Sequence, residues 1–143
     1  MVTHDRYTYI HGNTVGPTGD KGITIGNGEN INNAGERIEI SGNIVTGTKY
    51  PGIQVAWAVP YTYIYNNILT GCNYFGGDGT GDWDYASIHV AENCDNTIVD
   101  SNDVSDGING IQIWADNCTV TNNTIYDMGL RMWWCNIPHP ALS

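Results

Sequence analysis

The sequence has few basic residues and no long hydrophobic run. Its 143 residues contain five Lys and Arg against 15 Asp and Glu, a formal net charge of −10. A chain this acidic repels phosphate backbones and anionic lipid surfaces, so we expect neither nucleic acid nor membrane as a partner. No stretch is long enough to span a bilayer, and the start, MVTHDRYTYI, lacks the basic and apolar regions of a signal peptide. Localisation stays undetermined, with an extracellular location open if the natural start is trimmed.

Cysteine and proline are also scarce. The four cysteines, Cys72, Cys94, Cys118 and Cys135, show neither a CxxC spacing nor a neighbouring histidine at zinc spacing. We expect buried or partly buried thiols, with a Cys94–Cys118 disulfide as the alternative. Five prolines against 18 glycines, with apolar runs rich in Val, Ile, Thr and Tyr, favour short strands joined by tight turns.

One nine-residue pattern occurs five times. The copies are YTYIHGNTV from Tyr7, RIEISGNIV from Arg37, YTYIYNNIL from Tyr61, NTIVDSNDV from Asn96 and NCTVTNNTI from Asn117. Each copy has an aliphatic residue at its fourth and ninth positions and an asparagine at its seventh. These asparagines are Asn13, Asn43, Asn67, Asn102 and Asn123. Asparagine tolerates the left-handed backbone of a turn, and its amide can bond to the equivalent amide one coil away, which predicts an asparagine ladder.

A second, shorter pattern alternates with the first. It reads GITI from Gly22, GIQV from Gly52, SIHV from Ser87, GIQI from Gly110 and a degenerate GLRM from Gly129. Repeats of about 20–35 residues built from short alternating strands indicate a β-solenoid, in which equivalent residues stack about 4.8 Å apart. Alternation turns the aliphatic pairs of these strands inward. The outward row is then Thr24, Gln54, His89, Gln112 and Arg131.

With these two patterns the chain resembles the right-handed parallel β-helix proteins of the pectate-lyase-like superfamily, over roughly residues 6–132. The resemblance implies an all-β fold: a single-stranded right-handed parallel β-helix of about five coils with an asparagine ladder, in one domain covering residues 1–143. That superfamily contains polysaccharide lyases, glycoside hydrolases, uronan epimerases, phage tailspikes and non-catalytic surface proteins. The resemblance therefore implies the fold more specifically than the activity.

One coil is much longer than the others. From ladder asparagine to the next second-pattern strand the distance is eight or nine residues in three coils, but 20 between Asn67 and Ser87. The excess indicates a loop insertion at residues 72–85, and loops that project from a rigid solenoid often carry function. Its aspartates are Asp78, Asp82 and Asp84. Closely spaced carboxylates among glycines suit Ca²⁺, and a solvated acidic loop is the alternative.

The outward row of the second pattern is the candidate binding groove. Amides bond to sugar hydroxyls and indoles stack on sugar rings, so such a row suits a polysaccharide or oligosaccharide. The predicted sugar-binding residues are Gln54, Trp57, Gln112, Trp114 and Trp133. For Trp133 the alternative is that it covers the last coil. Tyr61, Tyr63 and Tyr65 form an outward stripe on another sheet, which we interpret as packing or a contact surface rather than a sugar platform.

Candidate catalytic residues surround the same groove. They are His89, Arg131, Glu92 and Asp116. Arg131 would meet a uronate carboxylate, or alternatively pair with Asp116. Glu92 and Asp116 lie on adjacent coils, which would allow the separation of about 5–10 Å that a paired-carboxylate mechanism needs. The resemblance implies lyases that use Arg or Lys with Ca²⁺ and hydrolases that use sets of aspartates, yet the chain has no adjacent aspartate pair and no Gly-His-Gly. We therefore predict a non-catalytic carbohydrate-binding or structural protein. A polysaccharide lyase or hydrolase acting on an acidic glycan is the alternative.

The two ends of a solenoid expose unpaired strand edges. No amphipathic cap helix precedes Tyr7, and the tail at residues 133–143 contains two prolines, which prevent further strand pairing. The sequence therefore predicts a homo-oligomer formed through exposed ends, or a piece of a longer β-helix.

Overall fold

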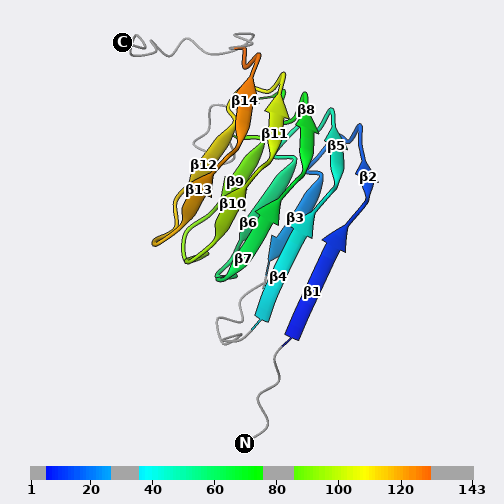
Figure 1. The fold of residues 1–143 in the computed structure, drawn as a ribbon. Coiled ribbons are helices and arrows are strands. Elements are labelled where there is room, and N and C mark those ends of the chain that lie inside the picture. The colour runs from blue at the N-terminus through cyan, green and yellow to red at the C-terminus, as the bar shows by residue number, and fades with distance from the viewer. Residues whose placement is uncertain (1–5, 27–35, 76–85, 130–143) are drawn as a thin grey trace, which may run out of the picture.

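The computed structural model describes residues 6–26, 36–75 and 86–129, and all regular structure in these ranges is β-strand. Fourteen short strands form three sheets in which every pair is parallel (Figure 1). Successive turns of the chain add one strand at a time to each sheet. The chain therefore winds as a parallel β-helix, as the alternating sequence patterns predict. The described ranges contain no helix long and apolar enough to cross a membrane.

The strands are grouped into sheets A, B and C. Sheet A, in the order β1-β4-β7-β10-β13, consists of Arg6–His11, Glu36–Ser41, Thr62–Tyr65, Ile98–Asp100 and Thr119–Thr121. Sheet B, in the order β2-β5-β8-β11-β14, consists of Thr14–Val15, Ile44–Thr46, Ile68–Thr70, Asp103–Ser105 and Thr124–Tyr126. Sheet C, in the order β3-β6-β9-β12, consists of Ile23–Gly26, Ile53–Ala56, Ile88–Val90 and Ile111–Ile113. The nine-residue pattern supplies sheets A and B, and the shorter pattern supplies sheet C.

The core is a stack of aliphatic side chains from the three sheets. Along sheet A the fourth positions of the repeat pair in register, so that Ile40 pairs with Ile64 and Ile64 with Val99. All three side chains are fully buried. The other fully buried aliphatics of the strands are Val45, Ile53, Val55, Leu69, Ile88, Val90 and Val104. The predicted inward face is confirmed, and burial of this area is the main favourable term in folding.

The asparagine ladder runs through all five coils. The Nδ2 atoms of Asn13, Asn43, Asn67 and Asn102 each donate to the Oδ1 of the next ladder asparagine at 2.9 Å. The main-chain N of the same residue donates to the same oxygen at 2.9–3.0 Å. From the second coil on, Nδ2 also reaches a main-chain carbonyl of the preceding coil, as Asn67 does with Ile40 at 2.9 Å. The ladder therefore satisfies buried amides and fixes the register of neighbouring coils.

The left-handed residue of this turn precedes the ladder asparagine. It is Gly12, Gly42, Asn66, Ser101 or Asn122 in the five coils, with φ between 52° and 66°. The expectation that the ladder asparagine itself adopts the left-handed backbone conformation is wrong. The ladder asparagine contributes through its side-chain amide. A neighbouring Gly, Asn or Ser turns the chain instead.

The described cysteines are thiols. Cys72, Cys94 and Cys118 are free, so the alternative Cys94–Cys118 disulfide is not formed. Cys72 and Cys94 are buried, and this burial raises the pKa of both thiols. They pack as small hydrophobic residues against the aliphatic core, as expected. Cys135 lies outside the described residues.

Only the first residues of the predicted insertion are described. The main-chain N of Asn73 donates to the Tyr50 carbonyl at 3.0 Å, and that of Tyr74 to the Thr48 carbonyl at 3.2 Å. Residues 72–75 therefore continue the stacking on the preceding coil. Residues 76–85 lie outside the described part of the chain.

Candidate functional site

The outward row of sheet C is aligned as the sequence predicts. Thr24 pairs with Gln54, Gln54 with His89, and His89 with Gln112 in the parallel register. Gln54 Nε2 lies 3.2 Å from His89 Nδ1, so the two side chains are joined across neighbouring coils. The Trp114 ring meets the His89 ring edge-on, with centroids 4.9 Å apart and planes at 81°. These four positions and Trp114 form one connected row.

The centre of this row is closed to solvent. Gln54 is 5% exposed and His89 is 1% exposed, whereas Thr24 at one end is exposed. The expectation of an open groove is therefore wrong at Gln54 and His89. Strand alternation determines whether a side chain points into the core or away from it. It does not determine whether other atoms cover the outward-pointing side chains. A substrate cannot reach either side chain in this arrangement.

The residues at the ends of the sheet C strands, Trp57, Glu92 and Asp116, are all exposed. The Trp57 ring is exposed and packs on Gly26, where a Cβ atom would come within 2.0 Å of the indole. Glu92 and Asp116 lie on adjacent coils, and the main-chain N of Asp116 donates to Asp95 Oδ1 at 2.9 Å.

Several predicted site residues lie outside the described ranges. They are Arg131, Trp133 and the loop aspartates Asp78, Asp82 and Asp84. Within the described ranges, no group of three or more His, Cys, Asp or Glu side chains is arranged to hold a metal ion. The calcium hypothesis for the insertion therefore stays a prediction.

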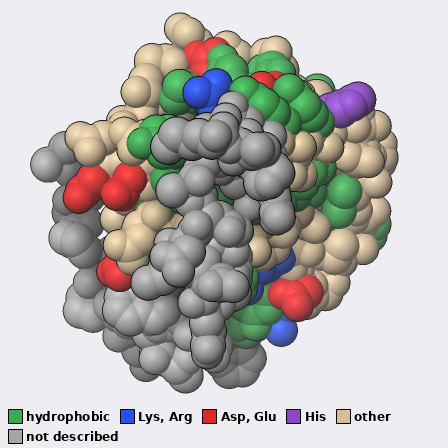
Figure 2. Space-filling model, turned by 90° about the horizontal axis from the view of Figure 1, so that it is seen from below, with side chains coloured by type: hydrophobic (Ala, Val, Ile, Leu, Met, Phe, Trp, Pro, Cys, Tyr) green, Lys and Arg blue, Asp and Glu red, His purple; other side chains and the backbone are tan. Residues whose placement is uncertain are grey.

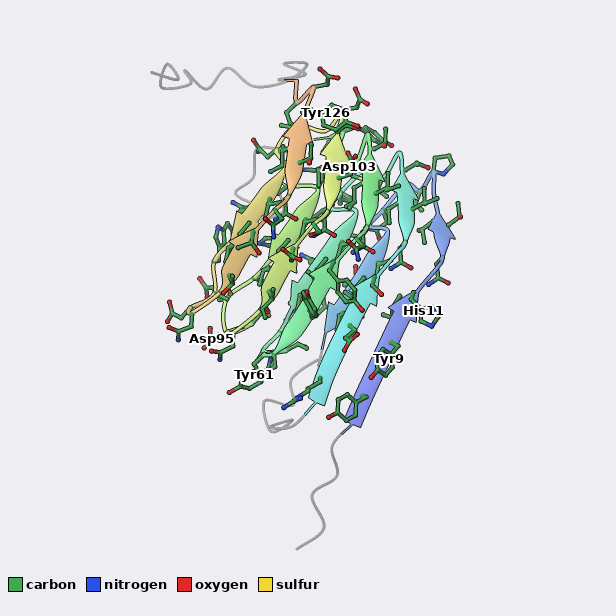
Figure 3. The ribbon with its side chains drawn as sticks, in the orientation of Figure 1. Tyr9, His11, Tyr61, Asp95, Asp103 and Tyr126 are labelled. Carbon is green, nitrogen blue, oxygen red and sulfur yellow. The ribbon has the colours of Figure 1, made fainter. Side chains whose placement is uncertain are left out.

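The exposed aromatic surface lies on sheet A. Tyr9 on β1 is 58% exposed and Tyr61, immediately before β7, is 55% exposed. Figure 3 shows both side chains projecting from the sheet A side of the solenoid. We call this surface the tyrosine face. Its aromatic residues are Tyr7, Tyr9, Tyr61, Tyr63 and Tyr65.

The tyrosines of this face are arranged in pairs on alternate coils. Tyr7 and Tyr9 stack with ring centroids 6.4 Å apart and planes at 12°, and Tyr63 and Tyr65 stack at 4.2 Å and 29°. The intervening coil places Glu39 between Tyr9 and Tyr63 in the register. Two coil steps separate these tyrosines by about 9.6 Å, a distance comparable to a disaccharide unit.

Polar groups lie among the rings of the tyrosine face. The Tyr65 hydroxyl donates to Glu39 Oε2 at 3.0 Å, and the Arg37 guanidinium lies 5.9 Å from the centre of the Tyr7 ring. Asp100 accepts hydrogen bonds from Thr121 Oγ1 at 2.7 Å and Asn122 Nδ2 at 2.9 Å. The tyrosine face therefore offers ring stacking and hydrogen bonding together. Seen from below the view of Figure 1, the molecule also has hydrophobic side chains next to acidic and basic ones (Figure 2).

Bonding to Thr121, and then to Asn122 and Ser101, holds the pKa of the Asp100 carboxyl below its usual value. Asp100 therefore stays ionised on this surface at neutral pH. An ionised carboxylate is a hydrogen-bond acceptor only, which suits the hydroxyl groups of a sugar.

From the sequence we interpret Tyr61, Tyr63 and Tyr65 as packing or a contact surface, without naming the tyrosines of the first coil. Tyr7 and Tyr9 occupy the first and third positions of the nine-residue pattern, as Tyr61 and Tyr63 do. The repeat alignment thus contains the signal, because equivalent positions in a solenoid share a face. The alignment does not indicate whether that face is exposed to solvent.

A hollow lies beside the turns that follow sheet B. It is a hollow of about 180 Å³, lined by Tyr74, Asp106, Gly107, Ile108, Asp127 and Gly129. Asp106 and Asp127 adopt positive φ at the turn where earlier coils have Gly16, Gly47 and Gly71. The hollow is smaller than typical small-molecule pockets, which start at about 300 Å³. We do not assign the carbohydrate site to it.

Comparison with known proteins agrees with the architecture. A family model described as the right handed beta helix region matches residues 1–135. The chain belongs to the right-handed β-helix family. No curated protein and no solved structure matches this β-helix protein. Family membership fixes the fold and leaves the ligand to be argued from the surface.

Proposed function

We propose that this β-helix protein binds a neutral polysaccharide or oligosaccharide on the tyrosine face of sheet A, without cleaving it. The observation that carries the proposal is a surface of exposed tyrosines, Tyr7, Tyr9 and Tyr61, continued by the half-buried stacked pair Tyr63 and Tyr65, with the Glu39 carboxylate on the coil between the two stacked pairs. Sugar rings stack on such side chains, and their hydroxyl groups bond to acceptors at the edges of the rings. The regular spacing of the coils gives the face a repeat, as a polymer ligand would require.

Charge favours a neutral glycan over an acidic one. The chain has a formal net charge of −10, so a polyuronate would approach against a repulsive field. On the tyrosine face, Arg37 is balanced by Glu39 and Asp100. A neutral glycan is not repelled by the negative charge of the protein, and carboxylates can accept hydrogen bonds from its hydroxyl groups.

The enzymatic alternative depends on the row of sheet C. A lyase or hydrolase acting there would need substrate at His89, and burial of His89 and Gln54 weighs against that.

Titration calorimetry with neutral and polyuronate oligosaccharides tests the proposal. We expect binding to a neutral glycan, and a loss of affinity of roughly three- to tenfold for Tyr9→Ala or Tyr61→Ala, since one aromatic contact contributes about 0.5–1.5 kcal/mol. Tyr126→Ala is the matched control, because Tyr126 on β14 is 45% exposed but belongs to sheet B. An equal loss in the control, or binding of polyuronates alone, would refute the assignment.

The same oligosaccharides, incubated with protein in calcium and in chelator, test the absence of cleavage. We follow unsaturated-product absorbance and new reducing ends. Neither signal should appear. Unsaturated product would indicate a lyase and reducing ends a hydrolase, and either would replace the non-catalytic proposal.

A further inference from the structure

The last described coil exposes residues that the coils before it bury. Val120 and Ile125 are 47% and 46% exposed, although their register partners Val99 and Val104 are completely buried. Sheets A and B also end there, since β13 and β14 each pair on one side only in the described ranges. Within the described ranges, the C-terminal end of the solenoid thus presents apolar side chains beside two strand edges that have no partner there, a combination that invites pairing with another chain.

The asparagine ladder gives the two ends complementary hydrogen-bonding groups. Ladder donors point toward the next coil, so the Asn123 main-chain N has no following oxygen in the described ranges, and its Nδ2 bonds only to the Val99 and Thr121 carbonyls. At the other end Asn13 donates to Asn43, while Asn13 Oδ1 accepts no bond from the described residues. The C-terminal end therefore offers donors and the N-terminal end offers the matching acceptor.

Charge selects the orientation of such a contact. Residues 86–143 contain seven acidic residues and one basic residue, Arg131, a net charge of −6. Residues 1–50 contain four basic and five acidic residues, a net charge of −1. Two C-terminal ends would repel each other, whereas a C-terminal end facing an N-terminal end avoids that repulsion.

We propose that a second copy of this chain stacks its N-terminal coil on the C-terminal coil of the first. Continuation of the observed register pairs β13 with the partner's β1, and directs the Asn123 donors to Oδ1 of the partner's Asn13. The contact is heterologous, so it leaves a free end on each side and builds a filament rather than a closed dimer. Stacking also extends the tyrosine face from one copy to the next.

Sedimentation velocity over a range of protein concentrations tests the stacking. Wild type should form species larger than dimers as concentration rises. Ile125→Lys should abolish them, since it places a charge at the centre of the C-terminal end. Ile68→Lys is the matched control, because Ile68 is 48% exposed but faces outward from the side of sheet B, and it should assemble like wild type. Monomers at every concentration, or equal loss in both variants, would overturn the proposal.

Mixing two blocked variants tests the orientation. Val15→Lys blocks the N-terminal end, because Val15 is half-buried on the edge strand β2. Val15→Lys and Ile125→Lys should each be monomeric alone and form one-to-one dimers when mixed. If Val15→Lys dimerises alone, the contact joins two C-terminal ends and the proposed orientation is wrong. Circular dichroism melting of each variant confirms that it is folded.

Discussion

The outer row of sheet C and the outer face of sheet A both point away from the core, but the first is buried at its centre and the second is exposed. Both consist of side chains that strand alternation turns away from the core, and both combine polar groups with aromatic rings. Yet His89 is 1% exposed and Tyr9 is 58% exposed. The comparison shows that strand alternation alone determines whether a side chain points out of the coil. Whether that side chain is exposed to solvent depends on which other residues pack on the same side of the coil.

The asparagine ladder allows the effect of burial on stability to be measured, because the same residue type occurs in it both buried and exposed. Asn67 is 1% exposed and joins both neighbouring coils, while Asn13 is exposed and joins only the following one. We expect Asn67→Ala to lower the free energy of unfolding by about 3–5 kcal/mol, since it leaves several buried groups unbonded. Asn13→Ala should cost only about 1 kcal/mol. Denaturant unfolding followed by circular dichroism measures both, and similar costs would contradict the ladder as the main source of register.

We expect substitutions in the row of sheet C to change the stability of the fold rather than the binding of glycan. His89→Ala removes a buried ring that contacts Gln54 and Trp114, so we expect a loss of about 2–4 kcal/mol in the free energy of unfolding. Thr24→Ala, at the exposed end of the same row, should change it by less than about 0.5 kcal/mol. Glycan affinity should be unchanged in folded His89→Ala. A loss of affinity without a loss of stability would return the site to sheet C.

Repeat spacing is sufficient to predict the path of the chain. The five ladder asparagines and the inward aliphatic pairs are periodic, and periodic residues in a solenoid must stack. Exposure is not periodic, because it depends on neighbours that differ from coil to coil. Val99 and Val120 occupy the same repeat position, but of the two only Val99 has a coil on both sides within the described ranges. For the same reason the sequence placed His89 on an open groove and left all five residues of the tyrosine face out of the candidate site.

The tyrosine face should tolerate small changes that the row of sheet C would not. Tyr65→Phe removes the hydrogen bond to Glu39 but keeps the ring that stacks on Tyr63. We expect a stability loss of about 1 kcal/mol or less, and a glycan affinity close to that of wild type. Tyr126→Phe on sheet B is the control for loss of a hydroxyl group. A tenfold drop in glycan affinity for Tyr65→Phe alone would show that the hydroxyl, rather than the ring, contacts the ligand.

The smallest expected effect concerns the carboxyl of Asp100. Its hydrogen bonds from Thr121, Asn122 and Ser101 lower its pKa in the folded protein, so they stabilise the fold above the unfolded pKa, and this contribution is lost as pH falls through the folded value. Thr121→Val removes the strongest of these bonds and should raise the pKa toward its usual value. Carbon-13 NMR titration of the carboxyl measures the change.

Thr119→Val separates this effect from a general change in the strand. Thr119 is exposed on the same strand, β13, and the bonds that hold the Asp100 carboxylate come from other residues. Its substitution should leave the Asp100 pKa as in wild type. The stability difference between wild type and Thr121→Val should also narrow as pH falls, since protonation of Asp100 removes the interaction in wild type as well. An unchanged pKa in Thr121→Val would mean that this bond does not form in solution.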